Sequence, residues 1–378
     1  MTAIIFNKAN AQQAADRLYR LYSRQMLDEI AVQLWIPSPP EMAKEPPLVD
    51  PQPDDNICRE RDPICWKELP VILEMYRRNA RRNYHNPDDS LPAEMPIFYF
   101  ENAIETAMLG GKVRFMGTRL HTFGDPVEPL IKDYRSFHWQ LPDEGNVWFQ
   151  RYLDAYRFMV QHAGNDFALK WQAGFTGMNL AVQFRGAEQA YVDMTENPDD
   201  LRKLLNYAHD LNIYLYGRVQ EIVGRHNHRL YGNHPLAKCG ISNQSVDAYS
   251  LCRPGTLRQW DKENLTRFNK LVGGTDLHIH ENSRHVIEEV AEIPGWLRVG
   301  FTDGPGWPRA FDIRWELRKR TKDIPLFFGG FKKEEFILAL KNHDLPGNAQ
   351  YGFGGVSSLD EAKRIMDQVL TYKAPACC

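Results

Sequence analysis

The sequence has no apolar run of the ~18 to 20 residues that a membrane-spanning helix needs. Its beginning also lacks the charged stretch and following apolar stretch of a secretory signal. Cysteine is scarce, with six in 378 residues, no CxxC pair and no dense framework. This usage is typical of reduced thiols in a reducing compartment. We therefore expect a cytoplasmic protein that does not insert into a membrane.

An excess of charge of either sign is also missing. Lysine and arginine number 46 against 49 acidic residues, which gives a formal net charge of −3. Such a chain has no overall attraction to nucleic acid or to an anionic membrane surface. With 43% hydrophobic residues the composition is that of a globular protein, which excludes the disordered, collagen-like and coiled-coil classes. A small-molecule substrate and a protein partner are the expected ligands, and a homodimer is compatible with the sequence.

The first 90 residues predict an N-terminal extension. Apolar residues recur at every fourth position through residues 11–34, which predicts one helix there. Seven prolines follow between Pro37 and Pro53. Because proline lacks a backbone donor and fixes its own φ angle, this segment is expected to form an extended arm.

From Gly274 onward the sequence alternates between strand and helix patterns. Four strand-then-helix units follow one another, about 21 to 28 residues apart, as in a parallel sheet with helical crossovers. No GxGxxG opens a helix, and polar residues or glycines follow successive strands. Both features favour an α/β fold of the (β/α)8 TIM-barrel type over an open doubly wound sheet. We expect one compact barrel over residues 91–378, behind the extension over residues 1–90.

The first candidate site is the strand TDLHIHE. Because side chains alternate along a strand, Asp276, His278 and His280 share one face and the two intervening apolar residues share the other. Residues two apart on a strand are close enough for both imidazoles to bind one metal ion. The alternative is that neighbouring carboxylates or backbone carbonyls satisfy both histidines.

Further candidates lie between residues 198 and 247. A long helix begins at Pro198 and is expected to stop at Gly224, ahead of a loop that carries His226 and His228. A strand is then expected over residues 235–239. Asn243 and Asp247, which follow that strand, are candidates for substrate binding.

Two more segments are candidates for ligand binding. Lys170 and Asn179 flank a small-residue loop that follows a strand expected over residues 167–171, and they are candidates for binding a flat ligand. Glycine pairs follow the last two strands, where barrels often bind phosphate with backbone amides. Tight turns with close packing are the alternative reading of these pairs. The four glycines are Gly329, Gly330, Gly354 and Gly355.

The order and spacing of these motifs over about residues 90 to 372 resemble the uroporphyrinogen decarboxylase superfamily. The motifs are GFTGMNLAVQFRGAEQAYVDMTENPDDL, ISNQSVDAYS, TDLHIHE, IPLFFGGF and YGFGGVSSLDEA. The resemblance implies a (β/α)8 barrel and at least two chemistries. Its decarboxylases use an arginine-rich N-terminal motif, whereas the corresponding segment EIAVQLWIPSPP contains no arginine. Its corrinoid-dependent methyltransferases are the closer branch.

In the thiol-methylating branch, the resemblance implies zinc held by an HxC motif and a later cysteine. The HxC motif aligns with His278 and His280, so the pattern here is HxH, and YGFGGVSS offers no later cysteine. Glu281, Cys239 and Asp303 are the candidates for the missing ligand. Zinc would then act as a Lewis acid or lower the pKa of a thiol acceptor.

The favoured function is a methyltransferase that moves a methyl group between a small O-, N- or S-methyl compound and a corrinoid protein or thiol. The cofactors implied are zinc and a cobalamin carried by a partner protein. Without zinc, His280 with Asp276 behind it is a candidate general acid, and Asp303 is a further catalytic candidate. Trp35 and Trp307 are expected to shape the substrate pocket. The alternatives are a cofactor-free decarboxylase or other lyase, and a non-catalytic barrel that binds a small ligand.

Overall fold

The computed structural model describes residues 4–38, 42–45, 59–60, 69–94, 103–117, 122–171, 177–239 and 243–375. Most of the proline-rich arm expected between Pro37 and Pro53 lies outside these residues. Cys239 and Cys252, which lie within them, are free thiols. No helix in the described part of the chain is long and apolar enough to cross a bilayer.

The main sheet has six strands, all paired in parallel. Its order is β1 (Ile30–Leu34), β11 (Ala349–Phe353), β10 (Leu326–Phe328), β9 (Trp296–Phe301), β8 (Thr275–Ile279) and β7 (Asn243–Ser245). A second parallel pair joins β3 (Ala93–Glu94) to β6 (Ala168–Leu169). A small antiparallel sheet contains β2 (Arg59–Glu60), β4 (Val113–Gly117) and β5 (Thr122–Pro126).

These strands form an α/β fold with a mostly parallel sheet. The parallel strands follow the chain in the order expected of a (β/α)8 barrel, from β1 through β3 and β6 to β11. Among the described residues, however, no backbone pairing joins β6 to β7 or β3 to β1. The hydrogen bonds therefore show an open sheet and a separate strand pair.

Side chains take the place of a neighbouring strand at two of these open edges. Along β1, the amides of Val32 and Leu34 donate to the carboxylates of Asp89 and Asp88, at 2.9 and 2.8 Å. Along β6, the side chain of Asn227 accepts from the Leu169 amide at 3.0 Å and donates to its carbonyl at 2.8 Å. Backbone groups that the ladder leaves unpaired are thus satisfied.

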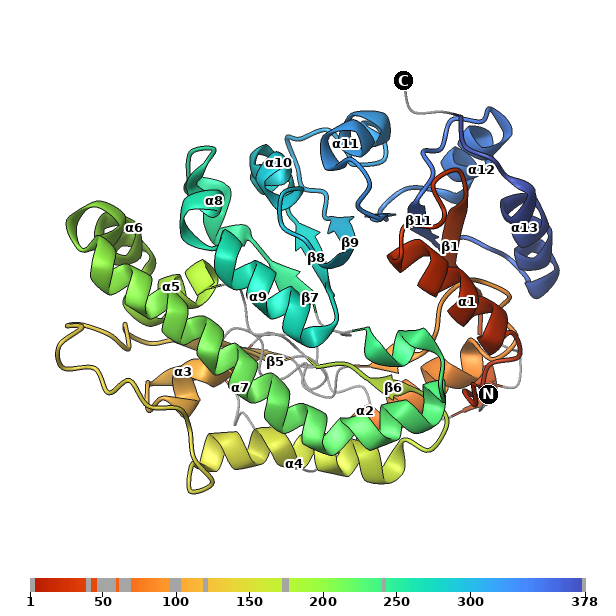
Figure 1. The fold of residues 1–378 in the computed structure, drawn as a ribbon. Helices are drawn as coiled ribbons and strands as arrows, with labels where there is room; N and C mark the ends of the chain where they lie inside the picture. The colour runs from red at the N-terminus through yellow and green to blue at the C-terminus, as the bar shows by residue number, and fades with distance from the viewer. Residues whose placement is uncertain are drawn as a thin grey trace.

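The helices lie outside the strands, and α4 lies along the long helix α7 (Figure 1). The first helices are α1 (Ala11–Tyr22), α2 (Leu69–Arg82), α3 (Ile104–Met108), α4 (Val147–His162), α5 (Gly177–Arg185) and α6 (Ala187–Glu196). The others are α7 (Pro198–Tyr231), α8 (Thr256–Trp260), α9 (Lys262–Val272), α10 (Ile287–Val290), α11 (Arg314–Thr321), α12 (Lys333–Lys341) and α13 (Leu359–Thr371). Short 3-10 helices are η1 (Met42–Lys44), η2 (Pro235–Lys238), η3 (Asp247–Leu251) and η4 (Glu281–Val286).

The strand and helix alternation of the C-terminal third is confirmed. Strands β8 to β11 lie where the sequence predicts them, and helices α11 to α13 follow β9, β10 and β11. Strand β6 also lies inside the stretch 167–171 that was expected to be extended. The sequence pattern therefore locates the strands that position the candidate site.

The predicted helix over residues 11–34 is wrong in its second half. Helix α1 ends at Tyr22, and residues 30–34 form β1 in the main sheet, paired with β11. The sheet thus begins inside the segment 1–90 that was expected to be an extension. Ile30, Val32 and Leu34 are fully buried. Their spacing of two residues fits the alternation of side chains in a strand as well as the sequence pattern fits a helix.

Two expectations about the middle of the chain are also wrong. Helix α7 does not stop at Gly224 but continues to Tyr231, so His226 and His228 lie on a helix. The strand expected over residues 235–239 is the 3-10 helix η2. Pro235 occupies its first position and lacks an amide, as suits the start of a helix.

Candidate functional site

Strand β8 presents two histidines at its carboxyl end. The burial of side chains alternates along the strand, with Leu277 and Ile279 buried and Asp276 and His278 partly exposed. His280 follows directly and is also partly exposed. The predicted face shared by Asp276, His278 and His280 is therefore confirmed.

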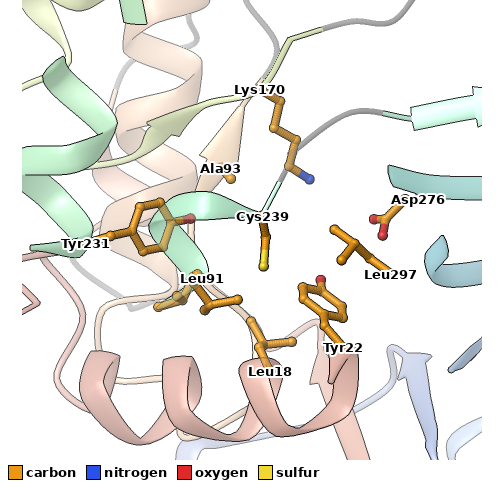
Figure 2. Close-up of a pocket in the computed structure, with 10 residues that line it drawn as sticks. Leu18, Tyr22, Leu91, Ala93, Lys170, Tyr231, Cys239, Asp276 and Leu297 are labelled. Carbon is orange, nitrogen blue, oxygen red and sulfur yellow. The ribbon is translucent and has the colours of Figure 1, made fainter. Parts of the chain in front are cut away.

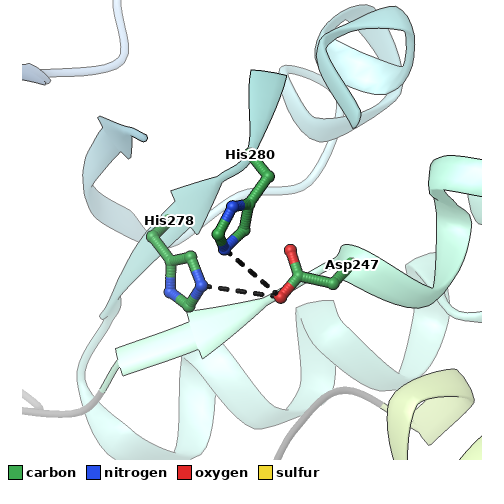
Figure 3. A group of neighbouring side chains, drawn as sticks. All are labelled: Asp247, His278 and His280. Atoms are coloured by element: carbon green, nitrogen blue, oxygen red, sulfur yellow. Dashed lines mark ion pairs between the residues drawn. The ribbon is translucent and has the colours of Figure 1, made fainter. Parts of the chain in front are cut away.

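Asp247 faces both imidazoles from the neighbouring element. Strand β7 pairs with β8 so that Ser245 lies beside His278, and Asp247 begins η3 two residues further on. Asp247 Oδ2 lies 3.6 Å from His278 Nε2 and 3.8 Å from His280 Nε2 (Figure 3). One ligand atom from each of the three residues lies within 4.8 Å of the others. Two imidazoles and a carboxylate thus converge on one point.

The backbone around Asp247 is fixed by side chains from other helices. Asn179 in α5 accepts from the Ala248 amide at 2.8 Å and donates to the Ser245 carbonyl at 3.4 Å. Tyr249 in η3 donates its hydroxyl to Asp261 at 2.8 Å. Asn179, a substrate-binding candidate in the sequence, thus contacts the backbone on both sides of Asp247.

Asp261 links this region to the rest of the core. Its carboxylate accepts from the Met178 amide at 2.9 Å and lies 3.0 Å from His209 Nε2. All of these groups are buried. The sequence gives no signal for this cluster, because its members are separated by up to 83 residues along the chain.

The electrostatics of Asp247 favour its ionised form. Burial alone raises the pKa of this carboxyl, but hydrogen bonds from His278 and Ser245 and the nearby imidazoles outweigh burial and leave the pKa lowered. The second carboxylate oxygen, Oδ1, is buried and has no hydrogen-bond partner in the part of the chain that the structure describes. A buried anionic oxygen without a partner is costly unless something binds it.

Glu281 lies on the other side of His280. Its Oε2 is 3.9 Å from His280 Nδ1, the ring nitrogen that faces away from Asp247. Gly304 leaves room for it, because a Cβ at that position would push the Glu281 carboxylate out of its place. Glu281 thus faces, without a hydrogen bond, the ring nitrogen through which carboxylates orient metal-binding histidines.

The other metal and acid candidates lie apart from the two histidines. Asp276 lies about 6.6 Å from His278 and about 13 Å from His280 along the strand, and it forms an ion pair with Arg298 at 2.6 Å. Cys239 lines a cavity that also contains Asp276. Asp303 binds Arg284 at 2.6 Å and accepts from the Ala310 amide at 2.8 Å. The carboxylate that faces His280 Nε2 is Asp247 instead.

The remaining binding candidates divide between two regions. Trp35 and Trp307 follow β1 and β9, at the carboxyl end of the strands, and their side chains are 52% and 53% exposed. Lys170 lines the same cavity as Asp276 and is not near the two histidines. Asn243 is the first residue of β7 and pairs with Asp276.

The glycine pairs form the turns before α12 and α13. Gly330 and Gly355 have φ angles of 73° and 78°, which side chains rarely adopt. One amide in each turn is bound by a carboxylate from the following helix, since Lys332 N donates to Glu335 and Ser357 N donates to Glu361. Within the described chain these turns thus cap helices with their own carboxylates.

Comparison with known proteins gives information at the level of fold. No protein-family model matches the chain, and no curated protein matches it. Among solved structures, 21 chains match. The chain shares its fold with a methyltransferase from Methanosarcina mazei. That structure is 16% identical, superposes with a TM-score of 0.53, and the match covers 80% of this chain and 87% of the neighbour.

Proposed function

We propose that this chain is a metal-assisted methyltransferase of the uroporphyrinogen decarboxylase superfamily. In this proposal the eight parallel strands form a closed (β/α)8 barrel, with Asp247, His278 and His280 at its mouth. The observation that carries it is the convergence of two imidazoles and one carboxylate at the carboxyl end of β8. Barrel enzymes have their active sites at this end of the strands. The methyltransferase among the structural neighbours supports the choice of reaction.

The three side chains fit zinc. An ion about 2 Å from each ligand needs ligand atoms about 3.3 Å apart, and the two distances to Asp247 Oδ2 are 3.6 and 3.8 Å. Two nitrogen ligands and one oxygen ligand leave a position open for substrate, as in catalytic zinc sites. Zinc supplies Lewis acidity toward an oxygen, nitrogen or sulfur atom, or lowers the pKa of a thiol.

The chain's own residues have distinct parts in this proposal. Asp247 contributes a negative charge, because its lowered pKa keeps the carboxyl ionised at neutral pH. Glu281 orients His280 through the opposite ring nitrogen. Trp35 and Trp307 offer exposed apolar surface at the same end of the strands, where the cobalamin of a corrinoid partner protein is proposed to dock. The methyl donor is a small O-, N- or S-methyl compound, and the acceptor is that cobalamin or a thiol.

The metal site is tested by elemental analysis of protein purified without a histidine tag. We expect about one zinc per chain, and its loss in Asp247→Asn and in the double variant His278→Ala/His280→Ala. His228→Ala is the matched control, because His228 is exposed on α7 and belongs to no metal-binding group among the described residues. Zinc retained by the double variant would contradict this site.

Methyl transfer is tested with methylcobalamin and small thiols, and with reduced cobalamin and a panel of O-, N- and S-methyl compounds. Absorbance distinguishes methylated from unmethylated cobalamin in both directions. We expect turnover by the wild-type chain and by His228→Ala, and none by the double variant. A zinc-loaded chain that transfers no methyl group in any combination would contradict the reaction while leaving the metal site intact.

A further inference from the structure

A second polar site lies at the other end of β8. A cavity of about 70 Å³ is lined by Lys170, Asp276, Tyr22 and Cys239 (Figure 2). A neighbouring cavity of about 260 Å³ shares Lys170 and Tyr22 and adds Glu94 and Arg298. Asp276 is the second residue of its strand, so this site lies toward the amino ends of the strands. The two cavities meet at Lys170.

Among the described residues, the side chain of Lys170 has no partner. Its backbone is fixed, because its amide donates to the Glu94 carbonyl at 2.8 Å and its carbonyl accepts from Tyr156 at 3.3 Å. The ammonium group points toward the cavity and has no hydrogen bond or ion pair to any described residue (Figure 2). Lys170 is half-buried, and an amine that faces a cavity without a partner among the described residues is available to a ligand.

The surrounding charges do not neutralise Lys170. Asp276 is the nearest carboxylate in the first cavity, but it binds Arg298 at 2.6 Å. Arg298 also donates to Gln350 and lies over the ring of Phe327, 4.8 Å from its centre. The positive charge of Arg298 thus offsets the attraction of Asp276.

Burial acts on Lys170 and Glu94 in opposite directions. Burial lowers the pKa of Lys170; Asp276 and Glu94 oppose this effect, whereas Arg298 adds to it. Burial raises the pKa of Glu94 to about 7, and Lys170 only partly offsets that rise. A desolvated amine gives up its proton more readily than an exposed one, and the neutral amine is a nucleophile.

We propose that Lys170 is an imine-forming site for a short aliphatic aldehyde or ketone. The amine nitrogen forms a bond to the carbonyl carbon, and the C=O electron pair moves to oxygen. Both amine protons end on that oxygen, which leaves as water, and a C=N bond remains. Glu94, which lines the same cavity, relays these protons. Leu18, Leu91 and Leu297 line the wall and suit a short alkyl chain.

This site is independent of the proposed metal centre. Asp276 lies two residues from His278 and four from His280, about 6.6 and 13 Å along the strand, and neither histidine lines either cavity. A chain that lacks the metal ligands is therefore expected to keep the lysine site. The two proposals can fail separately.

The experiment uses the full wild-type chain with propanal and sodium cyanoborohydride, which reduces an imine to a stable propylamine. Peptide mapping by mass spectrometry locates the propyl group. We expect Lys170 to be labelled faster than the exposed Lys238 at neutral pH, since a lowered pKa leaves more of the amine unprotonated and reactive. Lys238→Arg and His278→Ala/His280→Ala are expected to keep the label, and Lys170→Arg to lose it.

The wild-type result alone decides the proposal, so it does not depend on the folding of a variant. Labelling of Lys170 at the rate of Lys238, or slower, would overturn it. Loss of the label in the histidine double variant would show that the two sites are coupled and would overturn their independence.

Discussion

Asp193 in α6 shows what a fully satisfied carboxylate looks like in this protein. It accepts hydrogen bonds from Tyr134, Arg185, Gln189 and Asn197 at 2.7 to 2.9 Å. Asp247 differs, because one of its oxygens, Oδ1, is buried and has no hydrogen-bond partner among the described residues. Both carboxyls have lowered pKa values, but only Asp247 lies beside two imidazoles, which its Oδ2 faces. That difference separates a structural carboxylate from a candidate metal ligand.

The four hydrogen bonds to Asp193 predict an acid-sensitive contribution to stability. Burial raises its pKa, but the bonds from Arg185 and the other donors outweigh burial and lower the pKa to about 2. An ordinary aspartate in the unfolded chain has a pKa of about 3.9, so the ionised group contributes roughly 2.6 kcal/mol. Because the folded pKa is the lower one, this contribution is present above pH 4 and is lost as the pH falls toward 2.

We therefore expect Asp193→Asn to lose about 2 to 3 kcal/mol in the free energy of unfolding at pH 7, and less at pH 3. Urea unfolding at pH 7, 5 and 3 measures this difference. Asp210→Asn is the control, since its ion pair with Arg267 is exposed and is expected to contribute under about 1 kcal/mol. A loss that stays constant between pH 7 and 3 would refute the assigned pKa.

At the scale of elements, the free edge of β1 depends on two buried acids. Asp89 accepts from Arg17 Nε at 2.6 Å and from the Val32 amide at 2.9 Å, and all three groups are buried. Removing one partner of a buried ion pair leaves an uncompensated charge, which costs about 3 to 5 kcal/mol. We expect Asp89→Ala to lower the free energy of unfolding by that amount, as measured by urea denaturation.

The matched control is Glu292→Ala, which removes an ion pair with Arg258 and Lys262 at the surface. Surface pairs contribute about 0 to 1 kcal/mol. If Asp89→Ala and Glu292→Ala lower the free energy of unfolding by the same amount, the acids along β1 do not stabilise this edge as a neighbouring strand would.

Strand β1 also shows which part of the fold could not be predicted from the sequence. The C-terminal strands and helices are predictable because their patterns are local and repeated. Residues 30–34 fit both a helical spacing and a strand, and only the pairing with β11, over 300 residues away, decides for the strand.

The candidate site was also predictable only in part. Strand β8 could be predicted to place two histidines on one face. The carboxylate that meets them, Asp247, comes from another element. The sequence indicates Asp247 as a candidate for substrate binding but does not predict that it faces the two histidines.

At the scale of the molecule, the two proposed sites share strand β8 but lie at its opposite ends. The ring of Phe327 lies over Arg298, which belongs to the Lys170 cavity. Gly352 leaves room for that ring, since a Cβ there would come within 2.8 Å of it. Side chains thus fill the space between the two ends of the parallel sheet at this point.

Metal binding is expected to stabilise the whole chain, because the ligands from η3 and β8 meet only when the sheet is folded. A ligand that binds only the folded state adds about 2.7 kcal/mol at a concentration one hundred times its dissociation constant. We therefore expect zinc to raise the free energy of unfolding of the wild-type chain and of His228→Ala by that amount, measured by urea unfolding with and without a chelator. His278→Ala/His280→Ala removes two of the three ligands, so its unfolding should not respond to zinc. An equal response in the double variant would place the zinc elsewhere on the chain, since the site would then have only Asp247 to bind it.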